Sequence, residues 1–459
     1  MPNFTLPKDQ IPKAYEHQTK STEFQAGREA IFDMSDPGTG KTRAYLDGFA
    51  ERLRKDPTRK CLVLAPKSIL EPAWANDIVR FQPELKYSVA YAKNRTKAFQ
   101  DKSADIYITN HDAVKWLADN PWAYLNITDI VIDESTAFKN PSAQRSKAAK
   151  KLSKHFTHRV VMTGTPAPNT VTDLWNQAFI LDSGERLGTS YWRFRNSVCE
   201  PIRVGPAANM VQWVDREGAI EAVADLLSDI TVRNVFEECI DIPKNFTTDV
   251  GYDLPFALRK QYDILAEHAL IQLAQEDITA PNAAVLTGKL LQLASGAVYK
   301  NDSTVEVFDT ERYELIMQLI QERESCVVAY NWGHQLEQLC KLADKVKIPY
   351  SVINGAAKDS QRLQAVEDFQ NGVIKVIFAH PRSAAHGLTL TRGTTTIWSS
   401  PTWSSEQYTQ FNKRIYRAGQ TRKTETIHIT ANATLEEHVY NKLQGKIDQQ
   451  ATLLDILGI

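Results

Sequence analysis

The chain reads Ala30-Ile31-Phe32-Asp33-Met34-Ser35-Asp36-Pro37-Gly38-Thr39-Gly40-Lys41-Thr42 near its start. The apolar residues that open this stretch predict a buried strand, and the glycine-rich turn predicts a helix that begins near Lys41. Such a turn wraps backbone N–H groups around phosphate oxygens, and the dipole of the following helix favours an anion. We therefore expect a phosphate-binding loop in its looser form, because the strict pattern has glycine at Ser35. The alternative is a simple helix-capping turn.

The same alternation of short strands and polar helical stretches continues along the chain and predicts parallel sheets. The apolar β-branched runs lie at 30–32, 61–64, 106–108, 130–132 and 160–162, and again at 326–328, 351–353, 376–378, 396–398 and 426–429. Helical periodicity marks 258–275 and 283–293, and a final helix is expected over 435–457. The prediction is an α/β fold with an N-terminal domain over 1–182, a connector and helical insertion over 183–310 and a C-terminal domain over 311–459.

Composition places the chain among globular intracellular proteins. It has 459 residues, of which 42% are hydrophobic and 24% charged, which suits two or three domains. No apolar run has the length of a membrane span, and the first residues do not resemble a secretory signal. Five scattered cysteines fit reduced thiols. We expect a cytoplasmic protein of a bacterial or phage-infected cell, or a nuclear one if the source is eukaryotic.

Positive charge is concentrated in two windows, although the net charge is -1. No acidic residue lies between Glu134 and Asp173, or between Gln407 and Thr424. Basic segments without acidic residues are suited to bind the phosphate backbone of a nucleic acid. The alternative is that each segment forms a helix face that is exposed to solvent. Their basic residues are Lys139, Arg145, Lys147, Lys150, Lys151, Lys154 and Arg159 in the first window, and Lys413, Arg414, Arg417, Arg422 and Lys423 in the second.

Two further groups complete the pattern of an ATPase. Asp133 and Glu134 follow the strand 130–132, at the edge of a parallel sheet where active sites lie. With the phosphate loop they predict a hydrolytic site rather than a helix cap: Lys41 for the β- and γ-phosphates, Thr42 and Asp133 for Mg²⁺, and Glu134 as the base. Arg414 and Arg417 are one helical turn apart, so both can point at one anion.

The order of these motifs is similar to that of the Swi/Snf-type ATPases of helicase superfamily 2. The first domain carries a phosphate loop, the Asp-Glu pair and a Thr-Gly-Thr motif, and the second carries the paired arginines. The segments that carry the resemblance are Tyr15 to Gln18, Leu62 to Ser68 with Trp74, Ile108 to His111, Asp133 to Asn140, Met162 to Pro166, Asn169 with Asp173 to Trp175, Arg382 to Thr391, and Gln410 to Gln420. The resemblance covers about residues 11 to 445 and implies two RecA-like domains.

The resemblance also implies roles for individual residues. Gln18 reads adenine by its amide, the Thr-Gly-Thr motif senses the nucleotide, and hydrolysis needs closure of two domains around ATP and Mg²⁺. The implied nucleotide-binding residues are Gln18, Asp36, Gly38, Thr39, Gly40, Lys41, Thr42, Gly387 and Gln410. The implied nucleic-acid contacts are Lys67, Thr109, Lys139, Asn140, Thr163, Thr389 and Trp403.

The chain departs from the family pattern at several positions. Thr136 replaces a histidine, and Lys413 replaces an acidic residue. The family has two glycines and an asparagine in one motif, and this chain has Ala384, Ala385 and Thr389 at those positions. The family has Asn-Pro after the tryptophan that corresponds to Trp403, and this chain has Ser404-Ser405. Trp398 is expected to be a core aromatic, Arg392 to face solvent, and neither His111 nor His386 has a second ligand at metal-binding spacing.

The resemblance implies a monomeric, ATP-dependent translocase on double-stranded DNA that remodels or anneals it, from a phage or microbial source, with repair or recombination as its setting. A strand-separating DNA or RNA helicase is one alternative, but the 26 residues between Gly387 and Arg414 leave little room for a wedge. A catalytically silent nucleotide-binding scaffold is the other. Neither a membrane nor a particular protein partner is implied.

Overall fold

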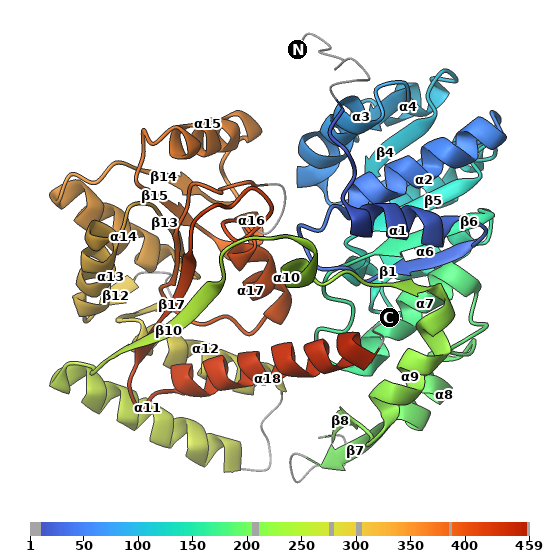
Figure 1. The fold of residues 1–459 in the computed structure, drawn as a ribbon. Helices are drawn as coiled ribbons and strands as arrows, with labels where there is room; N and C mark the ends of the chain where they lie inside the picture. Colours follow the sequence, from blue (N-terminus) through green and yellow to red (C-terminus); the bar gives the residue numbers. More distant parts are fainter. Residues whose placement is uncertain (1–10, 204–210, 275–279, 300–304, 385–387, 457–459) are drawn as a thin grey trace. The chain divides into compact units, whose positions relative to one another are not determined.

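A computed structural model describes residues 11–203, 211–274, 280–299, 305–384 and 388–456. The chain forms two compact units, coloured by sequence in Figure 1. One unit contains the residues up to Ile202, the segment Gln212–Asp241 and the residues from Asp448, and the other contains Ile242–Ile447. The segment 183–310, predicted as a connector, is therefore shared between the two units. In the described part of the chain, no helix is long and apolar enough to cross a membrane.

The first unit is built on a seven-stranded sheet in which all the strand pairs are parallel. The strand order is β3-β4-β2-β5-β6-β1-β9, so β1 lies between β6 and β9. The strands are β1 (Ala30–Asp33), β2 (Cys61–Ala65), β3 (Tyr87–Ala90), β4 (Ile106–Asn110), β5 (Asp129–Asp133), β6 (His158–Met162) and β9 (Thr231–Val232). The five strands predicted for this half of the sequence are all present.

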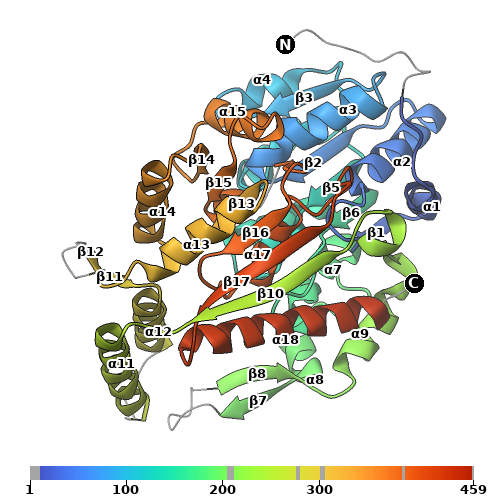
Figure 2. The ribbon, with the colours of Figure 1, turned by 60° about the vertical axis from the view of Figure 1, so that its left-hand side comes forward.

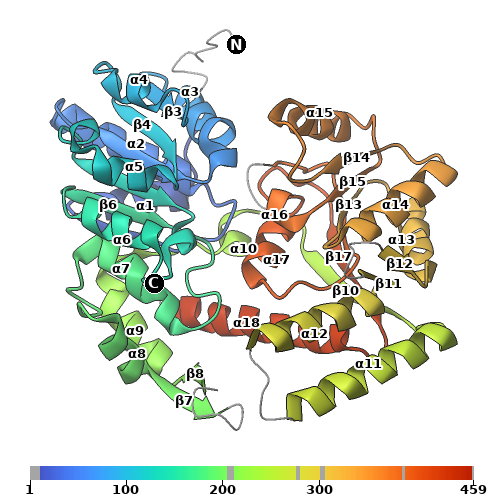
Figure 3. The same ribbon diagram turned by 180° about the vertical axis from the view of Figure 1, so that it is seen from behind.

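Helices cover both faces of this sheet because alternate residues of each strand point to opposite sides. Ile31 and Val63 face Leu46 and Phe49 of α2, whereas Phe32 and Leu64 belong to the other core, with α5, α6 and α7. Figure 3 shows α5, α6 and α7 on that second side. The helices are α1 (Glu16–Gln25), α2 (Lys41–Lys55), α3 (Asn76–Phe81), α4 (Arg95–Gln100), α5 (Ala113–Asp119), α6 (Gln144–Ser153), α7 (Leu174–Asp182), α8 (Tyr191–Val198), α9 (Ala219–Leu227) and α10 (Phe236–Cys239), and β7 (Cys199–Arg203) pairs with β8 (Val211–Asp215).

The second unit is also a parallel sheet, with the order β10-β17-β16-β13-β15-β14. Helices α13 and α14 pack against one face through Ile316, Ile320 and Leu339. Figure 2 shows β10 beside β17 at the edge. Its strands are β10 (Asn245–Tyr252), β13 (Cys326–Ala329), β14 (Tyr350–Ile353), β15 (Val376–Ala379), β16 (Thr395–Trp398) and β17 (Thr424–Ala431). Its helices are α13 (Glu311–Glu322), α14 (Gly333–Lys345), α15 (Asp359–Gln370), α16 (Pro381–Ala384) and α17 (Ser405–Asn412), together with the part of α18 (Leu435–Ile456) before Asp448.

The predicted helical insertion consists of α11 (Phe256–Ala274) and α12 (Ala280–Ala294). Leu258 and Tyr262 of α11 share a buried cluster with Leu290 of α12 and Ala431 of β17, so the insertion packs on the second sheet. A hairpin of β11 (Ala297–Tyr299) and β12 (Val305–Val307) follows it. Helical periodicity predicted α11 and α12, and the final helix expected over 435–457 is present as α18.

The sequence prediction missed the four hairpin strands β7, β8, β11 and β12 and three strands of the two large sheets, β3, β9 and β10. For the three sheet strands the reason is the same. β3 and β10 lie at sheet edges and β9 has two residues, so none shows the continuous apolar run of a central strand. β10 reads Asn-Phe-Thr-Thr-Asp-Val-Gly-Tyr, and most of its side chains are exposed. The α/β class with two parallel-sheet units is confirmed, and so is Trp398 as a core aromatic, because its side chain is fully buried.

Candidate functional site

The phosphate loop joins β1 to α2 in the first unit. Gly38 has a φ of 93° and Gly40 a φ of 83°, a backbone conformation that residues with a Cβ rarely adopt. A Cβ at Gly40 would also collide with the side-chain amide of Gln18. Helix α2 begins at Lys41, as predicted, so the loop leads directly into a helix N-terminus. The two glycines are thus required for the shape of the loop.

Lys41 folds back over this loop. Its Nζ donates to the backbone oxygen of Ser35 at 2.7 Å and to that of Asp36 at 3.2 Å. The ammonium is only partly buried, and its carbonyl partners are neutral, so a phosphate would be a stronger partner in this place. Thr42 follows in the first turn of α2 and is also partly buried.

The element predicted to read adenine packs on the same loop. His17 Nε2 lies 2.8 Å from the Thr39 backbone oxygen, and Gln18 Nε2 donates to that oxygen at 3.1 Å. The Gln18 Oε1 atom accepts from the backbone N–H of Tyr15 at 3.1 Å. Tyr15 is 54% exposed and stacks on His17 with ring centroids 5.6 Å apart. Gln18 therefore has a structural partner in the loop in addition to its predicted role with adenine.

Asn234, which follows β9, and Phe236, the first residue of α10, hold the other side of the loop. Ser35 Oγ accepts from the backbone N–H and the side-chain amide of Asn234, at 3.0 and 2.9 Å. The Asp36 carboxylate accepts from the backbone N–H of Phe236 at 3.0 Å. Motif comparison alone did not single out Asn234 or Phe236. The serine in place of the usual glycine was the available signal, because a buried hydroxyl needs a partner.

The acidic pair ends β5, beside β6 in the sheet. Trp74 Nε1 donates to Asp133 Oδ2 at 2.9 Å, and the Glu134 backbone N–H donates to Asp133 Oδ1 at 3.0 Å. Burial, and after it the charge of Glu134, raise the pKa of the Asp133 carboxyl to about 6, while the charge of Lys41 opposes the shift. Glu134 has a φ of 51°, which turns the chain sharply after the strand. His111 Nε2 lies 2.8 Å from the Asp133 backbone oxygen.

Thr136 connects the acidic motif to the Thr-Gly-Thr motif. Its Oγ1 lies 2.8 Å from Thr163 Oγ1 and donates to the Thr165 backbone oxygen at 3.0 Å. Gly164, between those two threonines, lies so close to Pro37 of the phosphate loop that an added Cβ would come within 2.5 Å of the proline ring. The three motifs are therefore in direct contact, and the threonine that replaces the family's histidine makes the hydrogen bonds between two of them.

The residues predicted to contact nucleic acid in the first unit fall into two groups. Lys67 and Asn140 are exposed, and Lys139 is partly buried and paired with Asp173 at 3.2 Å. Thr109 and Thr163 are fully buried instead. Thr109 Oγ1 donates to the Ala90 backbone oxygen at 2.7 Å, and Thr163 belongs to the network described above. Buried hydroxyls cannot reach a phosphate in this conformation, so the structure gives these two threonines a structural role in place of the expected contact.

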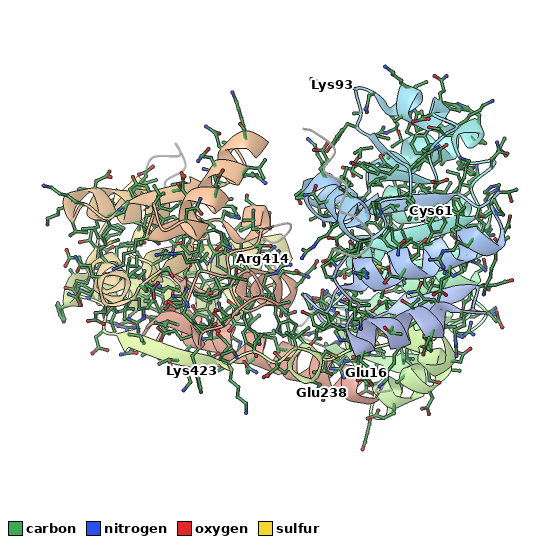
Figure 4. All side chains as sticks on the ribbon, turned by 45° about the horizontal axis from the view of Figure 1, so that its top comes forward. Glu16, Cys61, Lys93, Glu238, Arg414 and Lys423 are labelled. Carbon is green, nitrogen blue, oxygen red and sulfur yellow. The ribbon has the colours of Figure 1, made fainter. Side chains whose placement is uncertain are left out.

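The paired arginines of the second unit converge on one backbone oxygen. Arg414 Nη1 and Arg417 Nη1 donate to the Leu388 oxygen at 3.3 and 3.1 Å. Arg414 also donates to the backbone and side-chain oxygens of Gln410, at 2.7 and 2.9 Å. Figure 4 marks Arg414 in this unit. Both arginines lie beyond the end of α17 at Asn412, in turns and not in a helix, and it is these turns that bring the two cations to one acceptor.

Other predicted residues of this unit have mixed placements. Thr389 is exposed, and Trp403 is 38% exposed near Lys442, whose Nζ lies 6.0 Å from the ring centroid. Gly387 lies outside the described residues. The second basic window is not one continuous patch, because Arg414 is buried and Arg422 pairs with Glu324 at 2.7 Å. Arg392 is only partly exposed and lies 3.9 Å from the same glutamate, so it does not simply face solvent as expected.

Comparisons with known proteins agree with these motifs. Residues 21–294 match the SNF2-related domain, and residues 311–419 match the helicase conserved C-terminal domain. Protein p41 of Acyrthosiphon pisum secondary endosymbiont phage 1 is 30% identical over 97% of this chain and 98% of its own length. An uncharacterised ATP-dependent helicase of Mycoplasma genitalium is 23% identical over 88% of this chain, which spans 38% of that longer protein.

The chain is also similar to a solved structure, the SWI2/SNF2 ATPase core of Sulfolobus solfataricus in complex with double-stranded DNA. The identity is 23%, the TM-score is 0.46, and the match covers 96% of this chain and 92% of the other. The family assignment depends on the two matched domains and the phage relative. The chain belongs to the SNF2-related family and is a helicase-like ATPase.

Proposed function

We propose that this ATPase is a Swi/Snf-type translocase that moves along double-stranded DNA. The observation that carries the proposal is the contact between three motifs of the first unit. Pro37 of the phosphate loop touches Gly164, and Thr136 of the acidic motif is hydrogen-bonded to Thr163. A change at the nucleotide would move the Thr-Gly-Thr segment, and a motor needs such a link between ATP and its track.

The first unit supplies most of the groups for ATP. Lys41 would exchange its carbonyl partners for the outer phosphates, and the loop formed by Asp36, Gly38, Thr39 and Gly40 would supply backbone N–H groups. Gln18, whose amide contacts Tyr15 and Thr39 in this structure, would approach the base. Glu134 would hold and deprotonate the attacking water, because its carboxylate follows the strand end at Asp133.

Thr42 and Asp133 fit a Mg²⁺ ion that is held mainly by the nucleotide. Asp133 is a buried carboxylate with a raised pKa, which a divalent cation would lower. Among the described residues, no group of three or more acidic, histidine or cysteine side chains could hold a metal without a nucleotide. Mg²⁺ usually takes one or two carboxylates and several phosphate oxygens, and it neutralises phosphate charge when bound.

Arg414, Arg417 and Gln410 of the second unit would complete the site when the two units close. The guanidinium groups of Arg414 and Arg417 already converge on one oxygen, the geometry needed to stabilise the charge of a transferred phosphoryl group. Gly387 is proposed to line the same site from its motif position. Closure and opening in each cycle would move one unit along the DNA relative to the other.

The proposed track is the phosphate backbone of a duplex. Four lysines of the first unit are exposed: Lys67, Lys147, Lys151 and Lys154. Contacts from these side chains to phosphates would make the movement independent of the DNA sequence. The remaining proposed contacts to DNA are Lys139 and Asn140 in the first unit and Thr389 and Trp403 in the second. Thr109 and Thr163 would support them indirectly, because they are buried.

Displacement of a third strand from a DNA triplex tests this proposal. A duplex translocase should remove the third strand with ATP, separate a forked duplex poorly, and show ATPase activity that duplex DNA stimulates more than RNA does. Lys41→Ala is the control without turnover. Because released counterions drive phosphate binding, duplex affinity should fall steeply with salt. Efficient unwinding of forks without triplex displacement would support the helicase alternative, and a wild-type protein without ATPase activity would support the scaffold alternative.

A further inference from the structure

A cavity of about 660 Å³ lies in the first unit, among α6, α7 and α8, which Figure 3 shows on the same side of the sheet. It is distinct from the phosphate loop and from the carboxylates Asp133 and Glu134, none of which lines it, although Asn140 at the end of the acidic segment does. Its lining combines aromatic and basic side chains with small polar ones. The residues are Asn140, Pro141, Ser142, Lys147, Lys150, Trp175, Thr189, Ser190, Tyr191, Trp192 and Arg195.

The charge of this cavity is of one sign. Lys147, Lys150 and Arg195 line it, and no acidic residue does. None of the three forms an ion pair with a described residue, and burial together with the charge of Lys147 lowers the pKa of Lys150. Lys147 and Lys150 repel each other, and three cations without a carboxylate in the lining favour an anionic ligand.

Three aromatic side chains line this cavity, and one of them, Trp192, is largely exposed. Trp192 is 64% exposed, although an indole of this size normally lies mostly buried. The Arg195 guanidinium lies between two indoles, with its carbon 4.7 Å from the Trp192 centroid and 3.5 Å from that of Trp213. Lys150 Nζ lies 5.0 Å from the Trp175 centroid. Trp192 is thus supported from one side by Arg195 and still presents most of its surface to solvent.

An exposed ring among cations is suited to an unstacked nucleobase. Phosphates of a duplex need only positive charge, because its bases are stacked on one another and offer no free face. An unpaired strand offers both a backbone charge and free base faces, and proteins bind it with aromatic platforms in basic grooves. Asn140, already a proposed nucleic-acid contact, lies at this cavity and adds a polar group beside it.

We propose that this cavity binds an unpaired DNA strand, with one base stacked on Trp192 and the adjoining phosphates beside Lys147 and Arg195. The inference deepens the proposed function, because it concerns what a motor on duplex DNA would hold where the duplex ends or opens. The proposed site predicts the affinity of the chain for single-stranded DNA, which can be measured whether or not the protein translocates.

Fluorescence anisotropy with a labelled oligodeoxythymidylate and, separately, a blunt duplex tests the site on the full chain. Trp192→Ala should weaken binding of the single strand by about 5-fold to 150-fold, the range for loss of one base–aromatic stack, and should raise the ratio of single-strand to duplex dissociation constants. Trp122→Ala is the matched control, because Trp122 is 42% exposed and does not line the cavity. That variant should leave the ratio unchanged.

Trp192→Phe supplies a second readout that does not depend on lost affinity. A phenyl ring keeps a stacking face, so binding of the oligonucleotide should persist, while the quenching of tryptophan emission on binding should shrink relative to the wild type. Equal weakening of single-strand and duplex binding by Trp192→Ala would make the cavity part of the duplex track, and no weakening would leave it without a nucleic-acid role. Either result overturns the inference, whereas failure of triplex displacement alone overturns only the proposed function.

Discussion

The two units hold their proposed ATP-binding side chains in different ways. In the first, Asp133 is hydrogen-bonded to Trp74 and to the backbone, Thr136 is hydrogen-bonded to Thr163, and the loop is braced by Gln18 and Asn234. In the second, Arg414 and Arg417 meet at one backbone oxygen of Leu388. The first arrangement links three motifs to one another, whereas the second brings two arginines to one neutral acceptor, with Gln410 as a further acceptor for Arg414. We infer that nucleotide binding depends on the first unit, and that the second adds mainly to the rate.

The largest expected effect is the loss of an arginine from the second unit. Arg414→Ala and Arg417→Ala should each lower DNA-stimulated ATP hydrolysis by about 1,000-fold or more, the usual effect of removing an arginine finger, with ATP affinity changed only a few-fold. Steady-state turnover and equilibrium binding of a fluorescent ATP analogue measure the two quantities. Arg422→Ala is the matched control, because Arg422 pairs with Glu324. Normal turnover in both alanine variants would refute the role of the second unit.

The next effect separates binding from chemistry within the first unit. Glu134→Gln removes the proposed base but keeps the shape of the side chain, so turnover should fall by about 100-fold to 10,000-fold while ATP still binds. Lys41→Ala should weaken ATP binding and also lower turnover, because it removes the cation from the loop. Nucleotide binding and single-turnover hydrolysis distinguish them. A Glu134→Gln variant with near wild-type turnover would show that another group activates the water.

Acid should destabilise the second unit through a buried histidine. Burial, and after it the charge of Arg312, lower the pKa of His334 to about 4, and its Nε2 lies 3.0 Å from Ser295 Oγ. In the unfolded chain a histidine binds its proton near pH 6.5, so below that pH the unfolded state gains protons that the folded state does not. Between pH 7 and pH 5 this difference should remove about 2 kcal/mol from the free energy of unfolding.

Urea unfolding at the two pH values measures this effect in the wild type and in His334→Gln, which cannot be protonated. The variant should lose less stability on acidification than the wild type does. His158, in the first unit, has a pKa well below its usual value because of burial and the charges of Arg52 and Arg59, so part of the acid sensitivity should remain. An identical pH dependence in variant and wild type would contradict the assignment to His334.

The smallest effect concerns the brace behind the phosphate loop. Ser35→Ala removes the hydroxyl oxygen that accepts hydrogen bonds from the backbone N–H and the side-chain amide of Asn234. The loss of this acceptor should lower the stability of the first unit by about 1 kcal/mol. Ser88→Ala serves as a comparison, because its hydroxyl donates to one backbone oxygen elsewhere in the same unit. Urea titrations with a loop-bound nucleotide analogue present and absent would show whether the brace affects ATP binding. If Ser35→Ala were as stable as the wild type, the hydrogen bonds between Asn234 and Ser35 would not stabilise the phosphate loop.

Local sequence was sufficient for the parts whose structure depends on near neighbours. The strands 30–32 and 130–132, the helix start at Lys41 and the turn made by Gly38 and Gly40 follow from apolar runs and from the backbone freedom of glycine. The convergence of Arg414 and Arg417 was expected from helical spacing, but it occurs in the turns that follow α17, whose path the local sequence did not predict. These features depend on residues a few positions apart, which a single sequence displays directly.

Contacts between distant segments were decided only by tertiary structure. Nothing in the sequence shows that Asn234 holds Ser35, 199 positions away, or that the motif residues Thr109 and Thr163 point into the core. The cavity beside Trp192 likewise combines α6, α7 and α8, whose basic and aromatic residues are unremarkable in isolation. The physical reason is that the sequence determines which side chains an element carries, whereas burial, ion pairing and the partners of a polar group depend on which other elements pack against it.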